Sequence, residues 1–104
     1  MNVNLNDKLI TQIRELARKH PINRVVLFGS RARGDHHAAS DIDLAVFPLP
    51  DFNSRGMVNS EIDELTTLLK IDLVFVDEQT AADLLDRINR EGVLLYERSE
   101  SKTE

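Results

Sequence analysis

Cysteine is absent from this 104-residue chain, and other common features are missing with it. Without cysteine the chain can form no disulfide, no thiolate metal site and no cysteine nucleophile. No apolar run approaches the roughly 18 residues that a membrane-spanning helix needs, and the N-terminus has no signal-peptide pattern. These absences predict a small cytoplasmic domain that has no membrane partner.

A net positive charge is also absent, because 18 Asp and Glu residues outnumber 13 Lys and Arg residues and give a net charge of −5. General nucleic-acid-binding domains are usually basic, so nucleic acid is disfavoured as a direct partner. The charge is uneven: residues 1–40 carry a net +4 and residues 41–104 a net −9. Such a boundary between Ser40 and Asp41 is either two surfaces facing water or the charge pattern that a metal–polyphosphate complex needs.

Length and composition predict a single domain. A domain usually takes roughly 100–200 residues, and the 41% hydrophobic and 30% charged content is typical of globular proteins. We expect the domain to occupy residues 1–97. Residues 98–104 are polar and are expected to form a flexible C-terminal tail.

Hydrophobic periodicity predicts elements in the order α-β-β-α-β-α-β. Stripes at helical spacing predict helices over 5–19, from Val58 to Leu69, and between Thr80 and Gly92. Alternating or β-branched runs predict strands over 24–28, 41–47, 71–76 and 93–96, the last at a sheet edge. The order favours a mixed α/β (α+β) fold, a small mixed sheet with helices packed on one face.

The dipeptide Gly29-Ser30 follows the first predicted strand and opens a short helix or turn over 30–33. Glycine lets the backbone approach a ligand closely, and the N–H groups that follow favour an anion such as phosphate. The Ser30 hydroxyl can add a hydrogen bond, and Arg31 and Arg33 could reach further phosphate oxygens. Taken alone, the dipeptide is also compatible with an ordinary tight turn.

Asp41 and Asp43 stand two residues apart on a predicted strand, so both side chains should project from one face. Two unpaired carboxylates so close repel each other, and a divalent cation removes the conflict. Mg²⁺ prefers carboxylates together with phosphates and waters, and two such ions can clamp both oxygens of an in-line phosphoryl displacement. The alternative is an edge strand with one solvated face.

Asp72 lies one residue into the third predicted strand, between Ile71 and Leu73. If the second and third strands are neighbours, Asp72 can lie beside the first two aspartates. There it could bind the catalytic metal or accept the proton of an attacking hydroxyl. Alone it would be an ordinary strand-end charge, but the combination of Gly-Ser, Asp-x-Asp and a later Asp is much more specific than its parts.

Residues 25–34 (VVLFGSRARG) and 40–44 (SDIDL) resemble the signature of the polymerase-β-like nucleotidyltransferase superfamily. Minimal nucleotidyltransferases (MNT proteins) of prokaryotes are similar in three respects. These are the particular motifs FGSRARG and SDIDL, the predicted strand 70–74 (KIDLV), and the chain length. The similarity covers roughly residues 5–97, which is nearly the whole chain.

The resemblance implies a nucleotidyltransferase fold and a role for each motif residue. Gly29 and Ser30 would bind the nucleotide triphosphate, Asp41 and Asp43 the Mg²⁺ ions, and Asp72 would be the third carboxylate near the acceptor. MNT proteins are often encoded beside an all-helical HEPN-domain protein, many of which are RNases acting as toxins. In several such pairs the MNT protein is the antitoxin and transfers AMP from ATP to a tyrosine of the HEPN protein, which silences it.

The resemblance therefore predicts an Mg²⁺-dependent protein adenylyltransferase that uses ATP and forms a hetero-oligomer with a HEPN-domain partner. The chain has room for the catalytic half of a nucleotidyltransferase but not for a second, acceptor-binding domain. A partner must then present the acceptor, or the acceptor must be small. Two alternatives are a non-catalytic module that neutralises its partner by forming a complex, and nucleotidylation of a small molecule.

Overall fold

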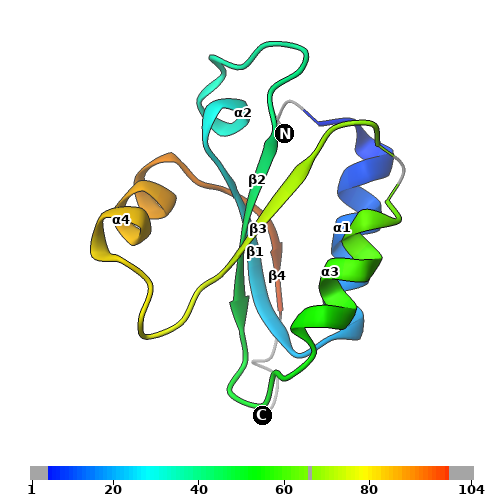
Figure 1. Ribbon diagram of the computed structural model, residues 1–104, viewed down its shortest axis with the longest axis vertical. Coiled ribbons are helices and arrows are strands. Elements are labelled where there is room, and N and C mark those ends of the chain that lie inside the picture. The colour runs from blue at the N-terminus through cyan, green and yellow to red at the C-terminus, as the bar shows by residue number, and fades with distance from the viewer. Residues whose placement is uncertain (1–4, 66, 99–104) are drawn as a thin grey trace.

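The computed structural model describes residues 5–65 and 67–98. The predicted order is confirmed there, and the segment after Gly29 is the short helix α2. The elements are α1 (Asp7–Lys19), β1 (Ile22–Phe28), α2 (Ser30–Arg33), β2 (Ile42–Pro48), α3 (Arg55–Asp63), β3 (Ile71–Phe75), α4 (Ala82–Glu91) and β4 (Val93–Glu97) (Figure 1). No helix within the described ranges is both long and apolar enough to span a membrane.

The four strands form one mixed sheet in the order β3-β2-β1-β4. β1 runs antiparallel to both β2 and β4, whereas β2 and β3 are parallel. The prediction of a mixed sheet with the last strand at an edge is therefore confirmed. The parallel pair brings the starts of β2 and β3 together, beside the end of β1, where Phe28 pairs with Asp43.

The main core lies between the sheet and helices α1 and α3, which cover one face (Figure 1). Apolar residues at helical spacing on α1, such as Leu9 and Ile13, are almost fully buried there. They meet the residues of β1 and β2 that point to this face, including Leu27, Ile42 and Leu44. Burying each such side chain stabilises the fold by about 1.5–3 kcal/mol.

Helix α4 lies on the opposite face, which differs from the expectation that all helices pack on one side (Figure 1). Its buried residue Ile88 packs against Val26, Phe28 and Ala45, and these form a second, smaller core. Because strand side chains alternate, Val26 and Ala45 point away from the main core. Both faces of β1 and β2 are apolar near the middle of the sheet, so each face needs a helix.

Helix α3 is shorter than the predicted segment, because it ends at Asp63 rather than near Leu69. The amides of Glu64 and Leu65 donate to carbonyls three residues back, at 3.2 and 3.1 Å, and this tighter turn ends the helix. Leu65 and Leu69 still pack against the main core. Their burial, rather than helical continuation, explains the apolar spacing.

Two side chains near the ends of predicted segments make contacts of their own. The hydroxyl oxygen of Thr80, where the last helical segment is expected to begin, accepts a hydrogen bond from the Asp77 amide at 2.9 Å and closes a turn before α4. Arg98 is the first residue of the predicted tail, and its side chain donates to the carbonyls of Ile22 at 2.9 Å and His20 at 2.6 Å. Residues 99–104 lie outside the described ranges.

Candidate active site at the start of strands β2 and β3

The register of the two parallel strands places Asp43 directly opposite Asp72. Neighbouring strands are about 4.8 Å apart, so the two side chains lie next to each other on one face. It is the face that carries α4, because Ala45 and Val74, two residues further along each strand, belong to the smaller core. The sequence-based expectation that Asp72 lies beside the Asp-x-Asp pair holds for Asp43.

Asp41 is exposed and precedes β2, which begins at Ile42 rather than at the predicted residue 41. The backbone on both sides of Asp41 is anchored. The Ile42 amide donates to the carbonyl of Lys70 at 2.9 Å, and the side chain of Arg31 donates to the carbonyl of Ser40 at 3.0 Å. Asp41 therefore has a fixed backbone and an open side chain.

The three aspartates form a patch of negative charge with little compensation. Within the described part of the chain, Asp41 and Asp43 have no hydrogen-bond or ion-pair partner, and Asp72 has only Lys70, whose ammonium lies 3.5 Å from its Oδ1. Burial raises the pKa of Asp43, and the charges of Asp72 and Asp41 raise it further, against the opposing effect of Arg87 and Arg33. Such a patch favours a bound cation.

The donor set fits Mg²⁺ rather than a metal held by the protein alone. Over residues 5–65 and 67–98, no group of three or more His, Asp or Glu side chains is arranged to hold a metal ion. Mg²⁺ needs no such cage, since it is usually bound through one or two carboxylates and completes its shell with waters and substrate phosphates. Adjacent carboxylates with uncompensated charge suit that mode of binding.

Gly29 places the backbone of the turn directly against Asp43. Its φ of 81° lies in the region that favours glycine, and a Cβ added there would come within 3.2 Å of Asp43 Cγ and closer still to Oδ2. The carbonyl of Gly29 accepts from the amides of Ala32 and Arg33, both at 3.0 Å. The Ser30 hydroxyl has no hydrogen-bond partner among residues that the structure describes.

The two arginines of α2 have different surroundings. Arg31 is only 6% exposed, and its guanidinium donates to the carbonyls of Ser40, Ala38 and His37 at 3.0–3.4 Å. A buried charge needs such bonds, so here Arg31 holds the loop before Asp41 instead of facing solvent. Arg33 is 41% exposed, and its pKa is raised, chiefly by a hydrogen bond to Asp35.

Glu91, the last residue of α4, is a site residue that sequence reasoning missed. Its Oε1 accepts from the Gly29 amide at 3.2 Å and from Arg33 Nη1 at 3.1 Å. Its Oε2 lies 4.0 Å from Nε of Arg87, and the side chain is only 16% exposed. Because 62 residues separate Glu91 from Gly29, no local pattern could reveal the contact.

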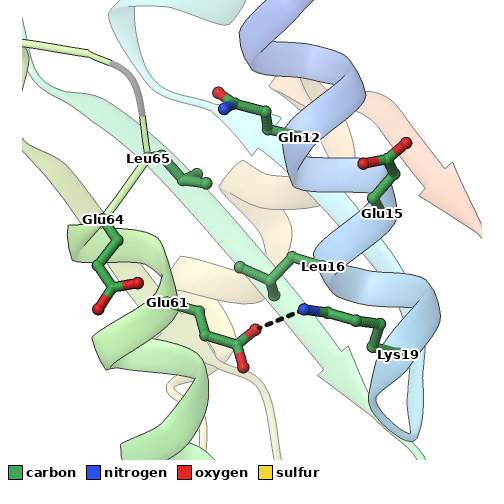
Figure 2. A pocket seen from close by; sticks show the side chains of 7 residues that line it. All are labelled: Gln12, Glu15, Leu16, Lys19, Glu61, Glu64 and Leu65. Atoms are coloured by element: carbon green, nitrogen blue, oxygen red, sulfur yellow. Dashed lines mark ion pairs between the residues drawn. The ribbon is translucent and has the colours of Figure 1, made fainter.

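A separate pocket of about 300 Å³ lies between α1 and α3, on the other face of the sheet (Figure 2). Glu61 reaches across it, with Oε1 3.6 Å from Nζ of Lys19 and 3.2 Å from Nε2 of His20. The hydrogen bond from His20 is the main cause of a lowered pKa at Glu61. None of the motif residues lines this pocket, so it is separate from the candidate active site.

The family model described as polymerase beta, nucleotidyltransferase matches residues 11–101. No curated protein matches the chain significantly. Among solved structures, a toxin–antitoxin with AMP-PNP is 24% identical over 86% of this chain and 74% of its own, with a TM-score of 0.65.

Two further solved structures are similar. A variant of the toxin–antitoxin MntA-HpeT is 27% identical over 92% of this chain and 76% of its own, with a TM-score of 0.60. The tri-AMPylated HEPN toxin of Shewanella oneidensis in complex with MNT antitoxin provides a chain 22% identical over 86% of this chain and 71% of its own, with a TM-score of 0.53. At 22–24% identity the likeness shows the fold alone.

Proposed function

The chain belongs to the polymerase beta nucleotidyltransferase family, and we propose that it is an Mg²⁺-dependent transferase that moves AMP from ATP to a tyrosine hydroxyl of a HEPN-domain toxin. In this role it is the antitoxin. The observation that carries the proposal is the pairing of Asp43 with Asp72 on adjacent strands, with the Gly29 backbone against Asp43.

The triphosphate would lie on the Gly29-Ser30 turn. Ser30 can donate its hydroxyl to a phosphate oxygen, and Arg33 keeps donors beyond those used by Asp35 and Glu91. The missing side chain at Gly29 brings the turn and Asp43 together, so phosphates on the turn would lie beside the carboxylates. Arg31 would act indirectly, by holding the loop that leads to Asp41.

Asp41 and Asp43 would hold two Mg²⁺ ions together with the phosphates, and Asp72 would complete the carboxylate set. When bound, the ions neutralise phosphate charge and favour departure of pyrophosphate. The like charges of Asp72 and Asp41 beside Asp43, which Arg87 and Arg33 offset only in part, support this assignment.

The transfer itself is an in-line displacement. The acceptor oxygen forms a bond to the α-phosphorus while the bond from that phosphorus to the bridging oxygen of the β-phosphate breaks, and pyrophosphate leaves. The hydroxyl proton would pass to the carboxylate of Asp72. Asp72 is 42% exposed and lies on the edge strand β3, so a large acceptor can approach it from outside the sheet.

A HEPN-domain partner is supported by the similar structures. One is a toxin–antitoxin with AMP-PNP and another contains a tri-AMPylated HEPN toxin bound to an MNT antitoxin. This chain has the same fold, and its motif residues are adjacent. These observations therefore favour an equivalent pair of this chain with a HEPN-domain toxin. A protein acceptor also agrees with a carboxylate at an open sheet edge.

The test is transfer of label from α-labelled ATP to the product of the neighbouring gene, the candidate HEPN-domain partner, in the presence of Mg²⁺. We expect label on the partner, and we expect its loss in the double variant Asp41→Asn/Asp43→Asn. The double variant Asp63→Asn/Asp86→Asn removes the same charge from exposed positions on α3 and α4 and should transfer normally.

Three outcomes would contradict the proposal. Transfer that survives the Asp41/Asp43 double variant would remove these residues from the active site. A double variant that transfers nothing but still silences the toxin would show that complex formation, rather than AMP transfer, is the antitoxin activity. Transfer to a small molecule but not to the partner would favour nucleotidylation of a small molecule as the activity.

A further inference from the structure

We propose that Glu91 is a positioning residue that fixes the Gly29-Ser30 turn against Asp43 and holds Arg33 beside it. The inference rests on the proposed function, since it concerns the same nucleotide site. It assigns a task to a carboxylate on α4 that none of the sequence motifs contains.

The backbone of Gly29 has both polar groups satisfied inside the protein. Its carbonyl accepts from the amides of Ala32 and Arg33 in α2, and its amide donates to Oε1 of Glu91. With both groups engaged, the Gly29 peptide is held in one orientation and is not itself an open donor for phosphate. An open donor of the turn is the adjacent Ser30 hydroxyl, which has no partner among the described residues and whose direction depends on that orientation.

Glu91 and Asp43 confine Gly29 from two directions. The side chain of Asp43 lies so close that a Cβ on Gly29 would clash with it, and Glu91 holds the amide of Gly29. Glycine has the widest conformational freedom of any residue, so a left-handed glycine needs external contacts to stay in one conformation. Without Glu91 the turn would keep its contact with Asp43 but lose the bond that sets its direction.

Glu91 is itself on rigid backbone. One turn earlier, Ile88 is 1% exposed and packs in the smaller core, and two residues later Val93 begins β4 and pairs with Leu27 of β1. The Glu91 carboxylate also lies 4.0 Å from Nε of Arg87 on the same helix. The packing and pairing of its neighbours thus fix the position of Glu91 relative to the sheet. The hydrogen bond from the Gly29 amide to Glu91 fixes the turn in the same way.

The same oxygen of Glu91 holds Arg33, with Nη1 at 3.1 Å, while Asp35 takes Nε at 3.1 Å. A guanidinium has five N–H donors in a rigid plane, so these two acceptors leave further donors available and fix their direction. Arg33 alone on an exposed helix would sample many rotamers. Glu91 therefore prepares both the Ser30 hydroxyl and Arg33 for a phosphate.

The opposite interpretation is that Glu91 competes with phosphate for the donors that it occupies. The two ideas predict effects of opposite sign. If Glu91 positions the turn, removing its carboxylate weakens nucleotide binding. If Glu91 competes, removing it strengthens binding.

The experiment measures the Kd of the full chain for a non-hydrolysable ATP analogue with Mg²⁺ by calorimetry. Glu91→Ala is expected to raise the Kd by at least about tenfold, which corresponds to about 1.4 kcal/mol. Glu91→Gln keeps an acceptor for the Gly29 amide and Arg33 and is expected to stay within about threefold of the unmodified chain. The matched control Asp86→Ala, which removes an exposed carboxylate from the same helix, should leave the Kd unchanged.

A second readout needs no nucleotide. In NMR spectra of the free chain, Glu91→Ala should shift the amide resonances of Gly29 and Ser30 and speed hydrogen exchange at Gly29 at least about tenfold, while Asp86→Ala should not. A Kd for Glu91→Ala equal to or below that of the unmodified chain would overturn the proposal, as would a Glu91→Gln variant as weak as Glu91→Ala.

Failure of the proposed function would give different results from failure of the positioning role of Glu91. If the unmodified chain binds no nucleotide, the transferase assignment fails, whereas the amide measurements still decide whether Glu91 holds the turn. Unchanged Gly29 resonances in Glu91→Ala would refute the positioning role, whatever the nucleotide result. A shifted Gly29 amide in a chain that binds nucleotide, together with a raised Kd, is the result that we expect.

Discussion

Two carboxylates on opposite faces of the same sheet have opposite environments. Glu61, between α1 and α3, has a hydrogen bond from His20 and a nearby Lys19, and these partners lower its pKa (Figure 2). Asp43, on the face of α4, has burial and two like charges instead, and its pKa is raised. The paired carboxylate contributes to the stability of the fold, whereas the unpaired one opposes it.

This difference separates a structural charge from a candidate functional one. Pockets do not make the same distinction, because the cavity of about 300 Å³ between α1 and α3 contains the paired group. Strained or uncompensated groups that persist in a fold are more often found at functional sites. The contrast can be tested by removing each carboxylate and by disturbing the glycine that lies against Asp43.

The largest expected effect comes from Asp43→Asn. Asparagine has the same shape without the charge, so the variant should lose transfer activity by about 100-fold or more, because metal stabilisation of the transition state is worth several kcal/mol. The same change should raise the Tm measured without metal, since it removes a charge that burial and two neighbours disfavour. A variant that is active, or less stable, would contradict the contrast with Glu61.

The second expected effect is on the turn. Gly29→Ala should destabilise the fold by about 1–3 kcal/mol, because a Cβ would meet Asp43 and the φ of 81° disfavours any other residue. Denaturant unfolding measures the change. The matched control is Gly56→Ala in α3, where an added Cβ meets nothing within 4 Å and should be neutral or slightly stabilising. Equal effects at the two glycines would show that the turn is not confined.

The smallest expected effect is at Glu61. Its lowered pKa means that the folded state favours the ionised form, so its contribution is complete above the ordinary pKa of about 4.3 and is lost as pH falls through the lower folded value. Glu61→Gln should therefore lower the Tm slightly at pH 7 and flatten the acid loss of stability below about pH 4.3. Transfer activity should be unchanged.

The contribution of Asp43 to stability should change with pH in the opposite direction to that of Glu61. A raised folded pKa favours the protonated carboxyl, so this group opposes folding at neutral pH and less so as pH falls. Melting curves of Asp43→Asn and Glu61→Gln from pH 7 to pH 3 compare the two directly. Parallel curves for the two variants would show that the two carboxylates do not differ.

Much of the fold could be predicted because it depends on local pattern. The order of elements, the mixed sheet and the edge position of β4 follow from periodicity and chain breaks. The end of α3 at Asp63 could not, because Leu65 and Leu69 continue the helical spacing although the chain has already left the helix. The side on which α4 packs depends on which sheet face remains uncovered, and spacing along the helix carries no such information.

The candidate active site, too, could be predicted from the sequence only in part. Gly29, Ser30 and the three aspartates are recognisable from residue type and spacing, since glycine permits a close backbone approach and like charges on one strand face destabilise a sheet unless a cation binds them. Arg31 has the same chemistry as Arg33 in the sequence, and only burial shows that it holds a loop.

The sequence by itself determined the chemistry that this chain carries, its family resemblance and the alternation that separates Asp43 and Asp72 from the apolar residues on either side of them in their strands, because side-chain type and a period of two are local properties. The tertiary structure alone decided that these residues are direct neighbours, that α4 covers their face, and that Glu91 meets Gly29 across 62 residues. Strand register, helix placement and long-range hydrogen bonds arise from the packing of the whole chain, so no local segment specifies them.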